Sequence, residues 1–202
     1  EGKETFNIPP YWSLYLIYFV LLIGKLTGQL SKKYEQQMLL RLKNRKQWWM
    51  ESHLKIWLEC MGYLAVTAIA FLVFSFCTKS AVEGINLELL KDYLGLEINK
   101  NNFRIFSMVL VFFVALLALT YIQYIVSLAI NAVTGILVSI VILVSSVYQI
   151  HPFLIGNYFM CIRQMMFAMD DVGFLTQGAV SGGIIFFMAV IGYQILKRKD
   201  LF

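Results

Sequence analysis

The sequence has few charged residues, since Asp, Glu, Lys and Arg make up only 14% of its 202 residues. A soluble domain typically carries about 25%. Hydrophobic residues make up 59%, which excludes an ordinary soluble domain and predicts an integral membrane protein. Cysteine is also scarce: Cys60, Cys77 and Cys161 show no C-x-x-C spacing, so we expect neither a disulfide framework nor a zinc site.

The motifs of common catalytic sites are missing from the sequence. It has no G-x-x-x-x-G-K-[ST] to bind ATP, no H-E-x-x-H and no G-x-S-x-G. We therefore expect no enzyme activity and no cofactor in this chain. The net charge of +5 does not indicate a nucleic-acid partner, because the basic residues flank apolar runs, as membrane topology requires.

Five apolar runs have the length that a helix needs to cross the hydrocarbon core, roughly 20 residues. Runs of this length without alternation exclude the strands of a membrane barrel. Asn131, with Thr134 and Gly135, predicts a tight turn between the third and fourth runs. The prediction is an all-α protein with a single transmembrane domain over residues 1–202 and spans at about 12–31, 54–77, 104–128, 131–150 and 179–196.

The segment 32–55 holds seven of the 17 Lys and Arg residues and only two acidic residues. Three more basic residues, at 197–199, follow the last run. Basic loops lie on the cytoplasmic side, and with five spans these two segments fall on the same side. We expect a multi-pass protein of the cell membrane with a cytoplasmic C-terminus. A sixth span upstream of Glu1 would complete this topology.

Two groups of residues accompany this topology. Apolar residues recur at three- and four-residue spacing over about 34–46, which predicts an amphipathic helix on the cytoplasmic side. Such a helix can lie on the bilayer surface or insert into a groove on a partner. Aromatic residues near the predicted interfaces are typical of an interfacial belt: Tyr11, Trp12, Trp48, Trp49, Trp57 and Tyr148.

The order of outer loop, span, helix with Glu35, Leu39, Arg41 and Arg45, and second span resembles the type-2 ABC permeases. The ending from Gly192 to Leu201 is similar to the tails of that family. The resemblance implies six helices per subunit, a dimer of identical or paired permeases, and a separate cytoplasmic ATPase that binds ATP and Mg²⁺. It also implies that the helix at 34–46 couples to the ATPase through Glu35, Met38, Leu39, Arg41, Leu42 and Arg45.

The outer segment 151–178 is rich in Phe and Met and is punctuated by proline and glycine. It is either an ordinary outer loop with a surface helix or a pair of re-entrant helices, as the resemblance implies. Phe153 and Phe159 are candidates for a gate in this segment. Gly24 and Gly28 allow close helix packing, either within the subunit or at a dimer interface.

Few polar groups lie inside the runs, which argues against an ion or proton pathway. The leading hypothesis is the permease subunit of an ATP-driven exporter of a hydrophobic or amphipathic substrate, with a peptide as first choice. The alternatives are a lipid or glycolipid exporter, a non-transporting immunity or sensor protein of the membrane, and an intramembrane enzyme that uses His151 and Asp170. The expected partners are an ABC ATPase, a second permease subunit, membrane lipid and the cargo.

Overall fold

The computed structural model describes residues 10–31, 45–78, 105–161, 163–164 and 173–198. Within these ranges the chain is helical and contains no strand. One short 3-10 helix, η2 (Ile155–Phe159), accompanies the α-helices. The α-helices are α1 (Pro10–Ser31), α3 (Arg45–Thr78), α5 (Ile105–Ala129), α6 (Ala132–Tyr148) and α8 (Gly173–Arg198).

Four of the helices in the described ranges, α1, α3, α5 and α8, are long and apolar enough to cross a membrane. The fifth, α6, is apolar but has only 17 residues. The predicted class of a multi-pass, all-helical membrane protein is therefore confirmed. The finer prediction, the type-2 ABC permease fold, stays a prediction.

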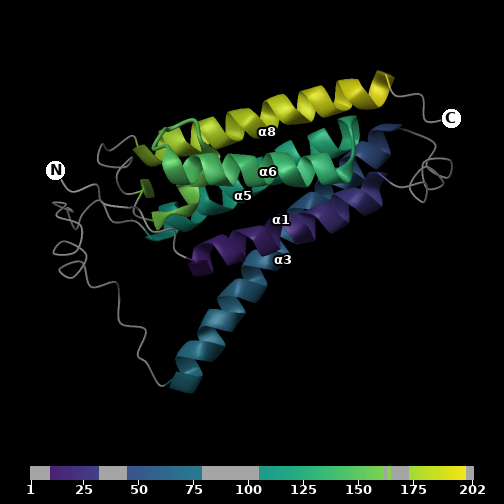
Figure 1. The fold of residues 1–202 in the computed structure, drawn as a ribbon. Helices are drawn as coiled ribbons and strands as arrows, with labels where there is room; N and C mark the ends of the chain where they lie inside the picture. Colours follow the sequence, from purple (N-terminus) through teal and green to yellow (C-terminus); the bar gives the residue numbers. More distant parts are fainter. Residues whose placement is uncertain (1–9, 32–44, 79–104, 162, 165–172, 199–202) are drawn as a thin grey trace.

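The helices run up and down between two ends of an elongated bundle. The C-terminal ends of α1, α5 and α8 lie at the same end as the N-terminal ends of α3 and α6 (Figure 1). We call this the inner end, because the sequence predicts it to be cytoplasmic, and the opposite one the outer end. The arrangement brings the flanks of the basic segment and the end of α8 together, as five alternating spans require.

The central element is α5, on which all the other described helices pack. In its most apolar window 61% of the residues are buried, against 6% in that of α3. Small residues on α5, such as Ala115 and Ala118, are fully buried and let neighbouring helices approach closely. A central helix of this kind can be apolar on every side.

A buried amide, Gln123 of α5, links three helices inside the core. Its Nε2 donates to the Val20 carbonyl of α1 at 2.9 Å, and its Oε1 accepts from the Ser139 hydroxyl of α6 at 3.3 Å. The side chain is fully buried. Because an unpaired amide in an apolar interior is costly, these two bonds fix the register of α1 and α6 against α5.

The turn predicted at Asn131 is confirmed. Asn131 caps the N-terminus of α6, with its side-chain oxygen accepting from the Thr134 N–H at 2.8 Å. Gly135 lies where α6 meets α5, and a Cβ at this position would be 2.6 Å from the Gln123 carbonyl oxygen. The short turn holds α5 and α6 antiparallel, and the glycine at position 135 lets the two helices pack closely.

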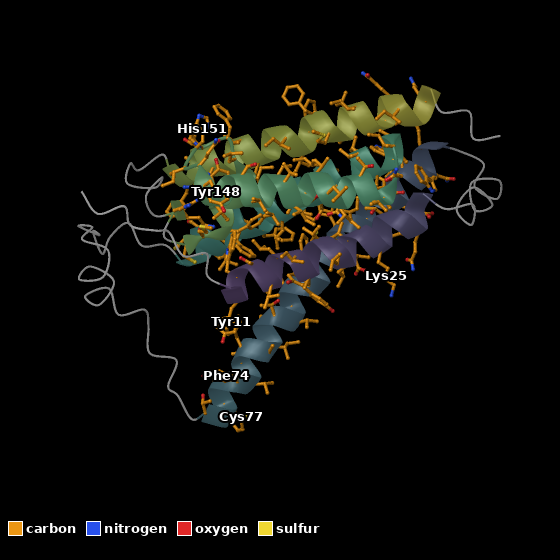
Figure 2. All side chains as sticks on the ribbon, viewed as in Figure 1. Tyr11, Lys25, Phe74, Cys77, Tyr148 and His151 are labelled. Carbon is orange, nitrogen blue, oxygen red and sulfur yellow. The ribbon has the colours of Figure 1, made fainter. Side chains whose placement is uncertain are left out.

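Helix α3 leaves the bundle part-way along its length. Its buried residues, from Trp48 through Ser52, Ile56 and Cys60 to Tyr63, recur every three or four residues and end there. Beyond Tyr63 the helix is largely exposed, and its outer half projects away from the other helices (Figure 1). Phe74 and Cys77 lie on this projecting part (Figure 2).

Two helices begin earlier than the sequence predicts. α3 begins at Arg45 rather than about 54, because its first turns are held by buried tryptophans rather than by lipid. α8 begins at Gly173 rather than about 179, so part of the predicted outer segment is helical. Gln177 in this added part is buried, and its Nε2 donates to the Gln164 carbonyl at 3.0 Å.

We expect Gly135→Ala to lower the stability of the protein by about 1–3 kcal/mol, because the added methyl overlaps α5. The readout is the thermal unfolding midpoint in detergent. Gly182→Ala is the matched control, since a Cβ there meets no atom within 4 Å. Equal midpoints for the two variants would contradict the close packing of α5 and α6.

Candidate functional site

The predicted coupling residues lie almost entirely outside the described residues. This holds for Glu35, Met38, Leu39, Arg41 and Leu42. Arg45 is the first residue of α3. The structure therefore describes α1, which ends just before the basic segment, and α3, which contains its last residues, 45–55.

Helix α3 is fixed at the inner end by an aromatic clamp, which consists of Trp49, His53, Tyr121, Tyr124 and Tyr193. The His53 Nδ1 lies 2.5 Å from the Tyr121 hydroxyl, and the two rings stack with centroids 5.1 Å apart. Trp49 packs edge-on against His53 at 4.3 Å and reaches Tyr124 at 6.0 Å and Tyr193 at 6.3 Å. The clamp thus joins the start of α3 to α5 and α8.

Gly192 of α8 makes room for the clamp. A Cβ at this position would overlap Ile125 and the Trp49 ring. One turn further along α8, the Lys197 ammonium lies 5.4 Å from the centre of the Tyr193 ring, within cation–π range. Trp48 and Trp49 are buried inside the chain, whereas Tyr11 and Tyr148 are 86% and 76% exposed, as expected for an interfacial belt.

A groove opens between α1 and the outer part of α3 because the two helices diverge. It has a volume of about 1210 Å³. We call it the tyrosine groove, after the tyrosines along its base. α1 contributes Tyr11, Tyr15, Tyr18 and Leu22, and α3 contributes Glu59, Gly62, Tyr63, Val66, Thr67, Ala70, Phe71 and Phe74.

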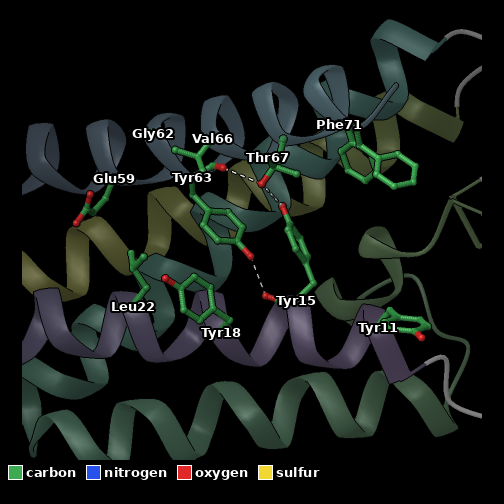
Figure 3. Close-up of a pocket in the computed structure, with 12 residues that line it drawn as sticks. Tyr11, Tyr15, Tyr18, Leu22, Glu59, Gly62, Tyr63, Val66, Thr67 and Phe71 are labelled. Atoms are coloured by element: carbon green, nitrogen blue, oxygen red, sulfur yellow. Dashed lines mark hydrogen bonds between the residues drawn. The ribbon is translucent and has the colours of Figure 1, made fainter. Parts of the chain in front are cut away.

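Hydrogen bonds hold the base of the tyrosine groove together. The Tyr63 hydroxyl donates to the Tyr15 carbonyl at 2.8 Å, and the Tyr15 and Thr67 hydroxyls are 3.2 Å apart. The rings of Tyr15 and Tyr63 pack with centroids 5.0 Å apart. Figure 3 shows Glu59 at one end of the groove and Phe71 near the other, with these bonds between them. Among the described residues that line the groove, Glu59 is the only carboxylate.

The two gate candidates at the outer end differ in burial. Phe159 is buried and packs edge-on against Phe112 of α5 at 5.4 Å, and its carbonyl accepts from the Trp12 indole at 3.1 Å. Phe153 is 68% exposed. Phe159 therefore closes the space between α1 and α5, while Phe153 faces outward. Whether either gates a pathway stays a prediction.

Arg163 anchors the outer segment to the end of α6. Its side chain is 5% exposed, and it donates to the Ser146 and Val147 carbonyls and to the Asn157 amide oxygen. Asn157 in turn donates to the Gln149 and His151 carbonyls. A guanidinium at the C-terminal carbonyls of a helix is favourable because the helix dipole is negative there. No local pattern in the sequence predicts this role.

Neighbouring Tyr158 is fully buried, and its hydroxyl donates to the Pro152 carbonyl. Burial raises the pKa of Tyr158 to about 12, so the group remains a neutral donor at physiological pH. These bonds stabilise η2 between α6 and α5. Residues 165–172, and Asp170 with them, lie outside the described residues, so the enzyme hypothesis based on His151 and Asp170 is not tested.

Gly24 and Gly28 both lie on the side of α1 that packs within the chain. A Cβ at Gly24 would overlap Ile136 of α6, and one at Gly28 would lie 3.6 Å from the Ala132 side chain. The two glycines therefore serve packing within the subunit, one of the two interpretations of the motif. A role at a dimer interface stays a prediction.

The sequence matches no family model and no curated protein, and the fold matches no solved structure. Across the described part of the chain, no three His, Cys, Asp or Glu residues gather as they would around a metal ion. The function therefore has to be argued from the aromatic clamp, the tyrosine groove and the position of the basic segment.

We expect Tyr121→Phe to lower the free energy of unfolding by about 0.5–1.5 kcal/mol, because it removes the hydrogen bond to His53 and leaves the rings in place. Chemical or thermal unfolding in detergent measures the change. Tyr148→Phe, at an exposed tyrosine, should change stability by less than about 0.5 kcal/mol. If both variants behave alike, the bond does not hold α3 to α5.

Proposed function

We propose that this chain is the permease subunit of an ATP-driven exporter of the type-2 ABC class. It moves a hydrophobic or amphipathic substrate, a peptide by preference, across the cell membrane, with its C-terminus in the cytoplasm. A separate ATPase binds ATP and Mg²⁺ and contacts the basic segment through Glu35, Met38, Leu39, Arg41, Leu42 and Arg45. A second permease subunit, identical or paired, completes the pathway.

One observation carries the proposal: α3 is packed against the bundle at the inner end and largely exposed at the outer end. The aromatic clamp holds its first turns against α5 and α8, and its burial stops at Tyr63. The basic segment, 32–55, continues into the first turns of this helix. A partner that pulls or presses on the segment would therefore act at the clamped end of a long, rigid helix.

The geometry suits the conversion of a small inner displacement into an outer opening. The part of α3 beyond Thr67 contains 11 residues, 68–78. At 1.5 Å per residue it is about 16 Å long, so a tilt of about 10° moves its tip by roughly 3 Å. The tilt would widen or narrow the tyrosine groove. Energy comes from the ATPase, and this chain supplies the lever and the apolar pathway.

The test is co-purification of the chain from its native membranes in mild detergent. A protein with a P-loop and ATP hydrolysis activity should accompany the wild-type chain. The double variant Leu39→Asp/Arg41→Glu should lose it, because an apolar contact and a positive charge are removed from the contact surface. Transport of the cargo should fall with it.

Arg198→Glu serves as the control for this experiment, since it reverses a charge at the same end of the bundle outside the basic segment. It should retain the ATPase. The proposal fails if no P-loop ATPase accompanies the wild-type chain. It also fails if the double variant retains the ATPase and full activity, a result that would favour a membrane sensor or immunity protein.

A further inference from the structure

The tyrosine groove combines a long apolar surface with one carboxylate. Phe71 and Phe74 are 70% and 66% exposed at its outer part, and Val66 is 68% exposed on the wall formed by α3. Glu59 of α3 lies at the opposite end of the groove, where Leu22 of α1 also lines it, and its side chain is partly buried (Figure 3). An ionisable side chain inside a membrane span is costly and points to a function.

We propose that the tyrosine groove binds an amphipathic cargo whose apolar body lies along α3 and whose ammonium or guanidinium group binds the Glu59 carboxylate. The identity of this ligand as cargo rests on the export function proposed above. The binding itself does not require the ATPase. The ligand is an amphipathic peptide, and a lysine or arginine side chain supplies its cationic nitrogen.

Charge complementarity selects the cation over other head groups. A carboxylate in surroundings of low polarity repels a phosphate or another carboxylate and attracts an ammonium strongly. Its neighbours in the groove add to this preference. Tyr63, one turn after Glu59 on α3, forms a ring pair with Tyr18 of α1 at a centroid distance of 6.4 Å, and the faces of such rings attract cations.

The dimensions favour a ligand larger than a single side chain. Ordinary pockets for drug-sized ligands measure about 300–1,000 Å³. The tyrosine groove, at about 1210 Å³, has room for several residues of a peptide or for one alkyl chain with its head group. Its base is fixed by the bonds among Tyr15, Tyr63 and Thr67, so most of the site exists before the ligand arrives.

Two lysines near the inner side of the groove set a limit on affinity. Lys55 precedes Glu59 by one turn of α3, a spacing at which the two side chains can pair. Lys25 follows Leu22 on α1 and is exposed, and its side chain extends away from the bundle (Figure 2). Neither lines the groove. A bound cation therefore competes with Lys55, which favours reversible binding over tight retention.

The test measures binding to the whole chain in phosphatidylcholine nanodiscs without ATPase or nucleotide. The probe is a fluorescent amphipathic peptide with one lysine, compared with the same peptide carrying glutamine instead. Empty nanodiscs supply the background from lipid. Dodecylamine, added as a competitor, distinguishes a general site for lipophilic amines from a site that needs a peptide.

Two variants separate the head-group contact from the apolar contact. Glu59→Gln should weaken binding of the lysine peptide about tenfold and leave binding of the glutamine peptide unchanged. Gly62→Phe should abolish binding of both peptides, since Gly62 lines the groove and a Cβ at this position meets no atom within 4 Å. Its matched control is Gly182→Phe on α8, another open position, which should bind like the wild type.

The inference is overturned if Glu59→Gln and the wild type bind the lysine peptide equally, or if Gly62→Phe binds as well as Gly182→Phe. Monodisperse elution and an unchanged unfolding midpoint show that each variant is folded. Binding that depends on Glu59, in a chain that no ATPase accompanies, would contradict the proposed function but support the binding site in the tyrosine groove. An ATPase that accompanies the chain, together with binding that does not depend on Glu59, would support the exporter and contradict this cargo site.

Discussion

The constraint on which the rest of the structure depends is the packing of every described helix against α5. Helix α5 is buried along most of its length, and its Gln123 side chain joins α1 and α6 through two hydrogen bonds. In lipid, apolar surface alone does not select one arrangement of helices, because the tails are as apolar as the side chains. Close packing and satisfied polar groups therefore decide it.

The burial of α3 against the bundle is confined to its inner part. The burial of α3 ends at Tyr63, after which the helix diverges from α1. The aromatic clamp lies where α3 packs on α5 and α8, and the tyrosine groove lies where α3 diverges from α1. The first fixes the helix next to the basic segment, and the second leaves an apolar surface with Glu59 at its end. Under the proposed function, α3 would carry both the lever and the cargo site.

At the outer end the backbone is irregular, so its carbonyl groups need hydrogen-bond partners within the protein. Arg163 and Asn157 supply them by binding the last carbonyls of α6 and the residues that follow. This is how non-helical backbone is tolerated at the edge of a bundle. Phe159 then fills the space between α1 and α5. At the residues of η2, the outer segment is therefore packed into the core and is not a free loop.

Local patterns in the sequence could predict the membrane class, the approximate helices and the turn at Asn131. They could not predict the aromatic clamp, since His53 and Tyr121 are 68 residues apart and neither stands in a motif. In the sequence, the position of Trp49 was equally compatible with a place in the interfacial belt. The coupling residues before Arg45 lie outside the described part of the chain, so that part of the sequence argument stands on charge and resemblance alone.

The sequence by itself determined that the chain forms several apolar helices of membrane-spanning length, and it predicted that the basic segment and the C-terminus share one side. Hydrophobic length and charge at the flanks are local properties, and they suffice for that. Only the tertiary structure decided that Glu59 lines a groove, that Trp49 is buried and that Arg163 holds η2. These depend on where two helices part and where a third meets them. Such crossings are set by side-chain volumes along several helices at once, which no single stretch of sequence contains.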